Sequence, residues 1–183
     1  MVNGNQLTVL FHVDDLKASH MEQSVLDELV QDLNNKFQTK KKKLSETKGN
    51  IHDYLGLTIS YQEKHQVIFT MYDFLEDILE DAPEDMNGTN ARTPAKSNLF
   101  TVDPTSKLLN VKEADAFHRR TARLLFAAKR ARPDIQVAVA YLCTRVKAPD
   151  QSDYAKLTRV IRYIRRTIHM PLVLGWDKSG TLL

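Results

Sequence analysis

The hydrophobic pattern of this 183-residue chain changes its period partway along, and a long aperiodic segment marks the change. Before residue 82, short apolar runs bounded by turn residues predict strands, with helices over 21–37 and 71–81. Residues 82–112 contain three prolines and show no period. After them, apolar residues recur every three or four positions, which predicts helices over 113–131, 134–147 and 151–168. The pattern predicts an α+β fold, with a mixed first part and an all-helical second part.

Strands are predicted in the first part by runs of β-branched and aromatic residues, over 6–12, 16–19, 54–62 and 66–70. The first two runs form a hairpin that turns at residues 13–15, and the last two form one that turns at 63–65. The run PLVLGW, residues 171–176, predicts a further strand near the end of the chain. The short connections within each hairpin make the strands before residue 82 a small antiparallel sheet, with a covering helix at 21–37.

Bulk features exclude several classes of protein. A single cysteine, Cys143, excludes a disulfide framework and a cysteine-rich zinc site. The polar start, MVNGNQ, is not a secretion signal, so the sequence predicts an intracellular protein. No apolar stretch approaches the ~20 residues that a membrane helix needs, so no membrane partner is expected.

The two parts of the chain differ in charge. Residues 1–110 carry 11 Lys and Arg against 17 Asp and Glu, whereas residues 111–183 carry 15 against 6, so balances of −6 and +9 give the net +3. Arginines at 159, 162 and 166 form one stripe on the predicted last helix, and four lysines stand together at 40–43. Such clusters indicate either contact with a polyanion or ordinary solvated surface.

Two adjacent aspartates, Asp14 and Asp15, follow the apolar run of the first predicted hairpin. Carboxylates are depleted from strands and costly to bury, so the pair marks either a solvated turn or a metal site. Two-metal phosphoryl transfer needs clustered carboxylates, and a tight turn can hold them rigidly beyond a sheet edge.

Five segments in order give the chain a resemblance to copia-type retrotransposon reverse transcriptases. FHVDDLKASH resembles the catalytic YxDD hairpin of that family, HDYLGLTIS its primer-grip strand, and TPAKSNL the short Thr-Pro segment that follows the grip. The stretch FHRRTARLLFAAKRARPDIQVAVAYLCTRV is similar to the helix pair of the family, and DYAKLTRVIRYIRRTIHMPLVLG to its last helix and strand. The resemblance extends from about residue 6 to residue 176.

The resemblance implies the C-terminal half of an RNA-directed DNA polymerase. Residues 1–81 would be a partial palm with the catalytic-type hairpin, the primer-grip strand and the first thumb helix. A linker at 82–112 and a helical thumb and connection at 113–170 would follow. Residues 171–183 would begin a truncated RNase H-like domain.

The chemistry implied by the resemblance is attack of a primer 3′-hydroxyl on the α-phosphate of a dNTP. Asp14 and Asp15 match the catalytic carboxylates, which hold Mg²⁺, or Mn²⁺ in its place. His12 stands where the family usually has tyrosine, beside the primer terminus. The implied partners are an RNA or DNA template–primer, a dNTP, and an N-terminal half with the fingers and the first palm strand.

Further residues of the implied nucleic-acid site match the primer grip and the last helix. Tyr54, Leu55 and Gly56 match the grip, and the arginine stripe of Arg159, Arg162 and Arg166 would line the template–primer groove. The third metal-binding aspartate of the family belongs to the first palm strand, and residues 1–13 contain no carboxylate. We therefore expect this chain to be inactive on its own. The alternatives are a non-catalytic nucleic-acid-binding remnant and a decayed reading frame.

Overall fold

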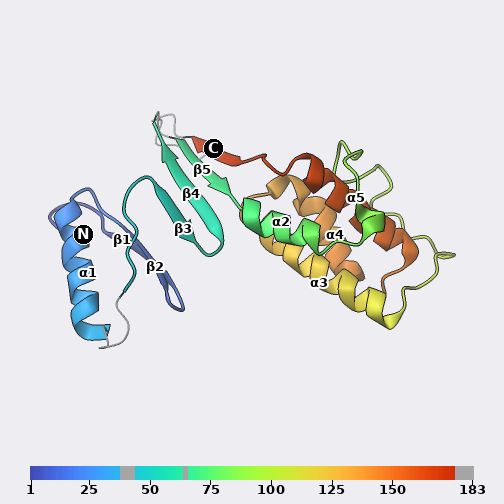
Figure 1. The fold of residues 1–183 in the computed structure, drawn as a ribbon, viewed down its shortest axis with the longest axis horizontal. Coiled ribbons are helices and arrows are strands. Elements are labelled where there is room, and N and C mark those ends of the chain that lie inside the picture. The colour runs from blue at the N-terminus through green and yellow to red at the C-terminus, as the bar shows by residue number, and fades with distance from the viewer. Residues whose placement is uncertain (38–43, 64–65, 176–183) are drawn as a thin grey trace. The chain divides into compact units, whose positions relative to one another are not determined.

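The computed structural model describes residues 1–37, 44–63 and 66–175. Contacts divide the chain into two compact units, Met1–Leu55 and Gly56–Leu183. Within the described ranges the chain forms two small antiparallel sheets and five α-helices, which confirms the predicted α+β class (Figure 1). The four-part domain division expected from the resemblance stays a prediction.

The first unit is small and buries little apolar surface. Its elements are β1 (Thr8–His12), β2 (Asp15–Ser19), α1 (Gln23–Phe37) and β3 (Ile51–Tyr54). The predicted hairpin is confirmed, because β1 and β2 pair antiparallel. Among its described residues, Val25 of α1 is the only hydrophobic side chain that is buried. A unit with so small a core gains little stability from apolar burial.

The sequence prediction of one strand over residues 54–62 was wrong, because the chain turns within that segment. Leu55 has φ 53° and Gly56 has φ 74°, so both residues adopt the left-handed conformation and β3 ends at Tyr54. Two consecutive positive φ values are typical of the tightest two-residue turns. Glycine adopts them readily, whereas leucine rarely does, so the apolar pattern concealed the turn.

The second unit contains a three-stranded antiparallel arrangement of β4 (Leu57–Gln62), β5 (Gln66–Thr70) and β6 (Leu172–Gly175), in the order β4-β5-β6. Gln62 pairs with Gln66, which confirms the predicted second hairpin. The strand predicted near the end of the chain is also confirmed, and it pairs with β5 in the register Phe69 to Leu172. Part of the predicted turn at 63–65 lies outside the described residues.

Helices form the rest of the second unit, and the three predicted after residue 112 are all present. The α-helices of this unit are α2 (Tyr72–Glu80), α3 (Val111–Ala128), α4 (Gln136–Arg145) and α5 (Gln151–Arg166). Two short 3₁₀ helices, η1 (Glu84–Met86) and η2 (Pro133–Ile135), lie between them. Capping boxes begin α3, through Asn110 and Glu113, and α5, through Asp150 and Asp153. Each box satisfies backbone N–H groups that the first turn of a helix leaves unpaired.

The main core lies among the helices of the second unit. Fully buried side chains come from every helix there, including Leu75, Phe117, Leu124, Val139, Leu142, Leu157 and Ile161. The segment between α2 and α3 also belongs to this core, since Met86, Ala91 and Leu99 are buried in it. The connecting segment is therefore anchored to the helices at these three positions, while most of its other residues are exposed.

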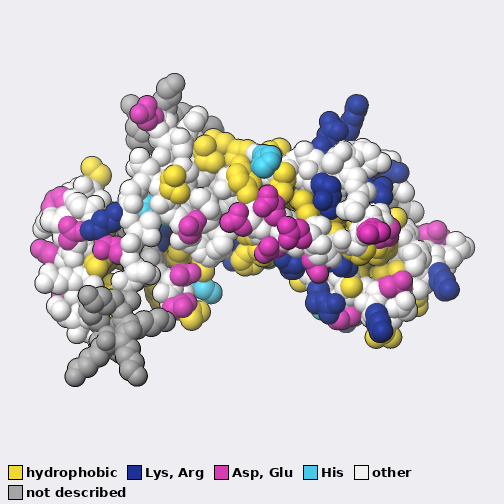
Figure 2. All heavy atoms as spheres, in the orientation of Figure 1, with side chains coloured by type: hydrophobic (Ala, Val, Ile, Leu, Met, Phe, Trp, Pro, Cys, Tyr) yellow, Lys and Arg dark blue, Asp and Glu magenta, His cyan; other side chains and the backbone are white. Residues whose placement is uncertain are grey.

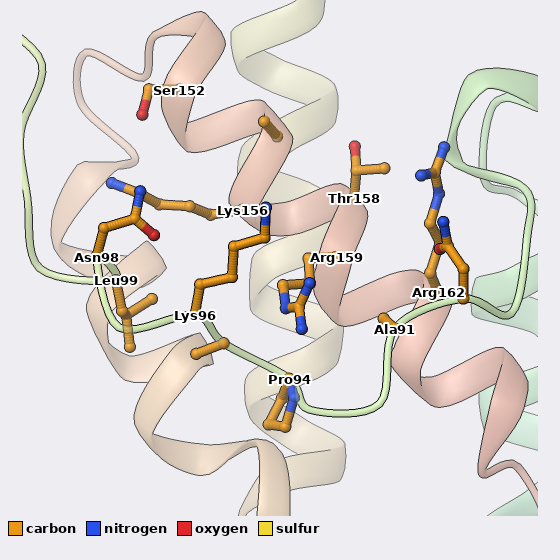
Figure 3. Close-up of a pocket in the computed structure, with 13 residues that line it drawn as sticks. Ala91, Pro94, Lys96, Asn98, Leu99, Ser152, Lys156, Thr158, Arg159 and Arg162 are labelled. Carbon is orange, nitrogen blue, oxygen red and sulfur yellow. The ribbon is translucent and has the colours of Figure 1, made fainter.

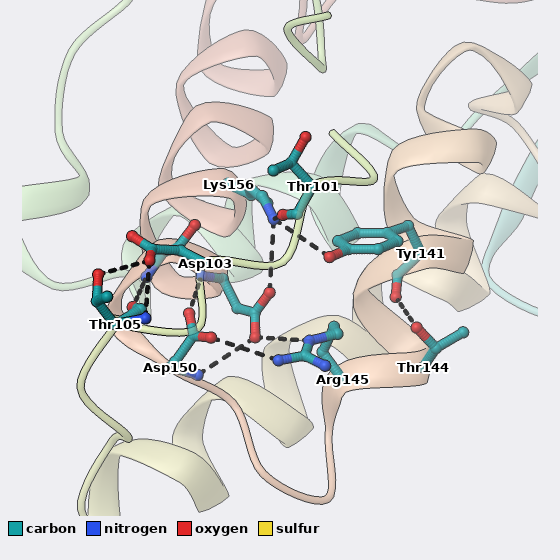
Figure 4. Close-up of polar contacts among 11 residues, drawn as sticks. Thr101, Asp103, Thr105, Tyr141, Thr144, Arg145, Asp150 and Lys156 are labelled. Atoms are coloured by element: carbon teal, nitrogen blue, oxygen red, sulfur yellow. Dashed lines mark hydrogen bonds and ion pairs between the residues drawn. The ribbon is translucent and has the colours of Figure 1, made fainter. Parts of the chain in front are cut away.

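A network of charged side chains joins α4, α5 and the segment before α3 (Figure 4). The Arg145 guanidinium donates to Asp153 at 2.9 Å and to Asp150 at 3.3 Å, and so compensates two buried carboxylates. The Lys156 ammonium lies 3.8 Å from Asp153 and donates to the Thr101 carbonyl at 2.7 Å. Because each buried carboxylate has partners, the α4–α5 corner is held in one geometry.

Candidate functional site

The two candidate catalytic aspartates lie at the tip of the β1–β2 hairpin. His12 pairs with Asp15, so Val13 and Asp14 are the two residues of the turn, and Asp15 begins β2. Both carboxylates are exposed, and neither makes a hydrogen bond or ion pair with a described residue. His12 is exposed beside them. The three residues are thus brought together by one tight turn, as the sequence predicted.

The hairpin turn carries an unusual backbone conformation. Val13 has φ 54°, and Asp14 is not among the residues with positive φ. A positive φ at the first central residue alone is typical of a type II′ turn, which favours glycine at that position. A β-branched residue there is strained by about 1–2 kcal/mol. Such strain is concentrated at functional sites in proteins, which makes this turn a candidate site on geometric grounds.

The hairpin tip fits part of a divalent-metal site. Two carboxylates provide the hard oxygen ligands that Mg²⁺ prefers, and water and substrate phosphates commonly complete its coordination. Among the described residues, no group of three or more His, Cys, Asp and Glu side chains could hold a metal ion. Asp14 and Asp15 could therefore supply two of the ligands of a metal ion, and the remaining ligands would come from outside this group of residues.

The residues that match the primer grip occupy a backbone turn. Tyr54 ends β3 and is half-buried, and Leu55 and Gly56 form the turn where the first unit ends and the second begins. A side chain at Gly56 would meet Met71 and Phe126 at 3.9 Å, so the positive φ, more than lack of space, favours glycine there. Within the first unit, β3 contacts β2.

The three arginines of the predicted stripe do not share one environment. Arg166 is exposed, whereas Arg159 and Arg162 are half-buried and donate to the segment that precedes α3. Arg165, which does not belong to the stripe predicted from the sequence, donates to the Leu79 carbonyl at 3.1 Å and to Asn87 at 3.0 Å. Most arginines of α5 thus form hydrogen bonds with α2 or with the segment between α2 and α3. Arg166 is the exposed member of the stripe.

A group of basic and polar side chains that the sequence pattern did not indicate meets Arg159 and Arg162. Lys96 and Asn98 come from the aperiodic segment, and Lys156 precedes Arg159 by three residues on α5. The only signal in the sequence was the i, i+3 spacing of 156, 159 and 162. Nothing in the pattern of residues 82–112 indicated that Lys96 would face this helix.

Charge is distributed unevenly over the second unit. On the face shown in Figure 2, Asp and Glu side chains gather over α2, whereas Lys and Arg side chains are scattered over the other helices of the second unit and the loops between α2 and α3. The lysines at 40–43 lie outside the described residues. None of the helices that the structure describes combines the length and the apolar character needed to cross a membrane.

Comparisons with known proteins give two similar proteins. Over 160 residues the chain is 27% identical to an uncharacterized mitochondrial protein of Arabidopsis thaliana, with 87% of this chain and 62% of that protein covered. Over 164 residues it is 23% identical to the "Putative transposon Ty5-1 protein" of Saccharomyces cerevisiae, with 90% of this chain and 50% of that protein covered.

The chain therefore spans between half and two thirds of the length of these relatives. No protein-family model matches it, and no solved structure matches it. Over nine tenths of its length, the chain is similar to a protein named for a transposon.

Proposed function

We propose that this chain is part of a retrotransposon-derived reverse transcriptase and carries two of its metal-binding carboxylates. The observation that carries the proposal is the β1–β2 hairpin, in which Asp14 and Asp15 lie exposed at a strained two-residue turn. The similarity to a transposon protein supports the same origin. The ordered motifs in the sequence extend this support from the hairpin to the helices.

Each residue at the hairpin tip has a distinct part in the proposed site. Asp14 and Asp15 would hold Mg²⁺, with Mn²⁺ as a substitute, and the paired strands β1 and β2 keep the carboxylates at the edge of the sheet. Bound there, the metal would lower the pKa of a primer hydroxyl and stabilise the leaving oxygen of a dNTP. His12, across the turn from Asp15, would stack on or donate to the primer terminus.

The nucleic-acid partner of this site would be a template–primer duplex. Tyr54, Leu55 and Gly56 would contact the primer strand, and α5 would contact phosphates, chiefly through the exposed Arg166. Arginine suits this task because its planar fork binds phosphate oxygens in pairs. Phosphate contacts supply affinity without sequence preference and make binding fall with salt.

Complementation of polymerase activity in trans tests the proposal. Residues 1–183 would be combined with a separate polypeptide that carries the fingers and first palm strands of a copia-type enzyme, and Mg²⁺-dependent dNTP incorporation would be measured. We expect incorporation by the pair and none by either part alone, because two carboxylates are too few for a two-metal site. Asp14→Asn should abolish it.

A matched control separates loss of the site from loss of charge. Asp32→Asn removes an exposed carboxylate of α1 in the same unit, so it should leave incorporation unchanged. If Asp14→Asn and Asp15→Asn left incorporation intact, the hairpin would not be the metal site. A non-catalytic nucleic-acid-binding remnant would be favoured by two results together. The two combined polypeptides would incorporate no dNTP, and the affinity of the chain for duplex would be the same with and without the two substitutions.

A further inference from the structure

A pocket of about 300 Å³ lies in the second unit between α5 and the loop of residues 90–99, called here the covering loop. Of the 13 residues that line it, four are basic and none is acidic. The basic residues are Lys96, Lys156, Arg159 and Arg162. Figure 3 shows the covering loop crossing α5, with Lys96 from the loop and Arg159 from the helix entering the space between them. This volume is in the range of pockets that bind small molecules.

Both arginines of the pocket direct hydrogen bonds to neutral groups. Arg159 donates from Nη2 to the Thr93 hydroxyl at 2.9 Å, and Arg162 donates from Nη2 to the Asp85 carbonyl at 2.8 Å. The Nε nitrogens of the two arginines are buried and have no hydrogen-bond partner among the described residues. Each guanidinium has five N–H donors, so most of its capacity to bind an acceptor is unused.

Of the two lysines, Lys96 extends toward Arg159, whereas the Lys156 ammonium lies at the other end of the pocket and donates to the Thr101 carbonyl and the Tyr141 hydroxyl. Lys96 is exposed on the covering loop and makes no ion pair with any described carboxylate. Lys156 is partly compensated, because its ammonium lies 3.8 Å from Asp153. Three of the four cations in the lining therefore have no carboxylate partner in the part of the chain that the structure describes.

Cations gathered in a partly enclosed site repel one another more strongly than on open surface, because less water screens them. A bound anion removes that repulsion and accepts hydrogen bonds from the unused arginine donors. Asn90 and Asn98 also line the pocket and can donate to the same ligand through their side-chain amides. The lining is thus chemically matched to a compact, multiply charged anion.

We propose that this pocket binds the terminal phosphate or diphosphate group of a small ligand or of a nucleic-acid end. A terminal phosphate carries about −1.5 to −2 charges at neutral pH, whereas an internal phosphodiester carries one. An internal phosphodiester is also esterified on two oxygens, so both continuing ends of the strand would have to fit through the opening of the pocket. The inference does not depend on the hairpin, because Asp14 and Asp15 belong to the other unit.

Calorimetric titration of the full chain with inorganic pyrophosphate, in the absence of divalent metal, tests this proposal. We expect saturable binding of one pyrophosphate per chain. Lys96→Gln and Arg159→Gln should each weaken it by about tenfold or more, since hydrogen bonds to charged groups contribute strongly to affinity. Lys147→Gln, which removes an exposed charge outside the lining, is the matched control and should leave binding within about twofold.

The Lys96 variant keeps the test independent of folding, because the Lys96 side chain is exposed and makes no hydrogen bond or ion pair with another described residue, and the substitution leaves its backbone hydrogen bond with Leu99 in place. Circular dichroism and thermal unfolding of this variant should match those of the wild-type chain. Absence of saturable binding would overturn the proposal. Equal losses in Lys96→Gln and Lys147→Gln would overturn it as well, because they would show attraction to overall charge alone.

Competition with oligonucleotides identifies the source of the phosphate. Displacement of pyrophosphate by a 5′-phosphorylated single strand, but not by the same strand with a 5′-hydroxyl, would support a nucleic-acid end. Displacement by nucleoside diphosphates alone would support a free nucleotide. If both strands displaced pyrophosphate equally, internal phosphates would be sufficient and the assignment to a terminal phosphate would be wrong.

Discussion

His12 and Asp15 are paired across the β1–β2 hairpin, which leaves Val13 and Asp14 as a two-residue turn with Val13 at φ 54°. A one-residue shift of this register would move both aspartates relative to the strands that hold them. The two-residue turn therefore determines the direction in which the two carboxylates project from the hairpin. The positive φ of Val13 is needed to keep this turn, and so to keep the carboxylates in position.

Replacing Val13 with glycine should stabilise the hairpin locally. The substitution relieves about 1–2 kcal/mol of left-handed strain and costs about 0.4–1 kcal/mol through greater freedom of the unfolded chain. Slower hydrogen exchange of the β1 and β2 amides would report the gain. Val9→Gly, the same change in extended backbone, should speed exchange. Faster exchange in Val13→Gly would contradict the strain assigned to this turn.

The ion pair between the buried Arg132 and the partly exposed Asp134 should be important for the stability of the second unit. Arg132 is 1% exposed, and its guanidinium donates two 2.9 Å hydrogen bonds to Asp134 and two more to the Thr167 carbonyl and hydroxyl. Arg132→Met should lower the free energy of unfolding by about 1.5–3 kcal/mol, because Asp134 and Thr167 lose the donors of Arg132 while the Asp134 side chain, 24% exposed, keeps some contact with water. Urea titration measures the loss.

The double variant Arg132→Met with Asp134→Leu provides the control for this prediction. It removes both charges, so it should recover a large part of the stability lost in the single variant. If the double variant were no more stable than Arg132→Met, the loss would come from packing and from Thr167 instead of from the unpaired carboxylate.

The same ion pair predicts a pH dependence in the acid range. Burial acts to raise the pKa of Asp134, but the hydrogen bonds and charge of Arg132 outweigh it, and the pKa lies below the ordinary 3.8. A carboxylate with a lowered folded pKa stabilises the fold above its unfolded pKa. That contribution is lost as the pH falls through the folded value.

The melting-temperature difference between wild type and Asp134→Asn should therefore be constant near neutral pH and shrink below pH 3.8. Asp115→Asn is the comparison, because Asp115 pairs with Arg119 on the exposed surface of α3 and such pairs contribute little. A difference for Asp134→Asn that persisted unchanged to pH 2 would contradict the lowered pKa.

Nucleic-acid binding should depend on salt and on the exposed arginine of α5. Replacing Arg166 with alanine should reduce the slope of log affinity against log salt by up to about 0.9 on duplex DNA, the value for one phosphate contact. Fluorescence anisotropy at several salt concentrations gives the slope. Lys112→Ala, an exposed charge near the start of α3, is the control. Equal slopes for wild type and Arg166→Ala would place this arginine outside the interface.

The helices of the second unit could be predicted from the sequence because local signals agreed with the final packing. In α3 and α5 the apolar period coincides with the buried face, and Pro133 stands in the first turn of η2, where its lack of an N–H costs little. The hairpin with Asp14 and Asp15 was equally predictable, because two apolar runs flank turn-forming residues.

The covering loop and its pocket could not be predicted, because they depend on contacts between distant segments. Met86, Ala91 and Leu99 are buried, but their spacing follows no helix or strand period. Lys96 faces α5 only because these side chains hold the loop there. The stripe of Arg159, Arg162 and Arg166 was visible as a pattern, yet the burial that separates Arg166 from the other two is a tertiary effect.

The position of β6 beside β5 also has a consequence for the order of folding. Gln66 pairs with Gly175, and all the helices from α2 to α5 lie between these two residues in sequence. Closing so long a loop in an unfolded chain is slow, whereas compact helices formed beforehand shorten the distance to be searched. The helices and the β4–β5 hairpin are therefore expected to form first, and β6 to dock last. The slowest folding phase would then be the pairing of β6 with β5, which completes the sheet.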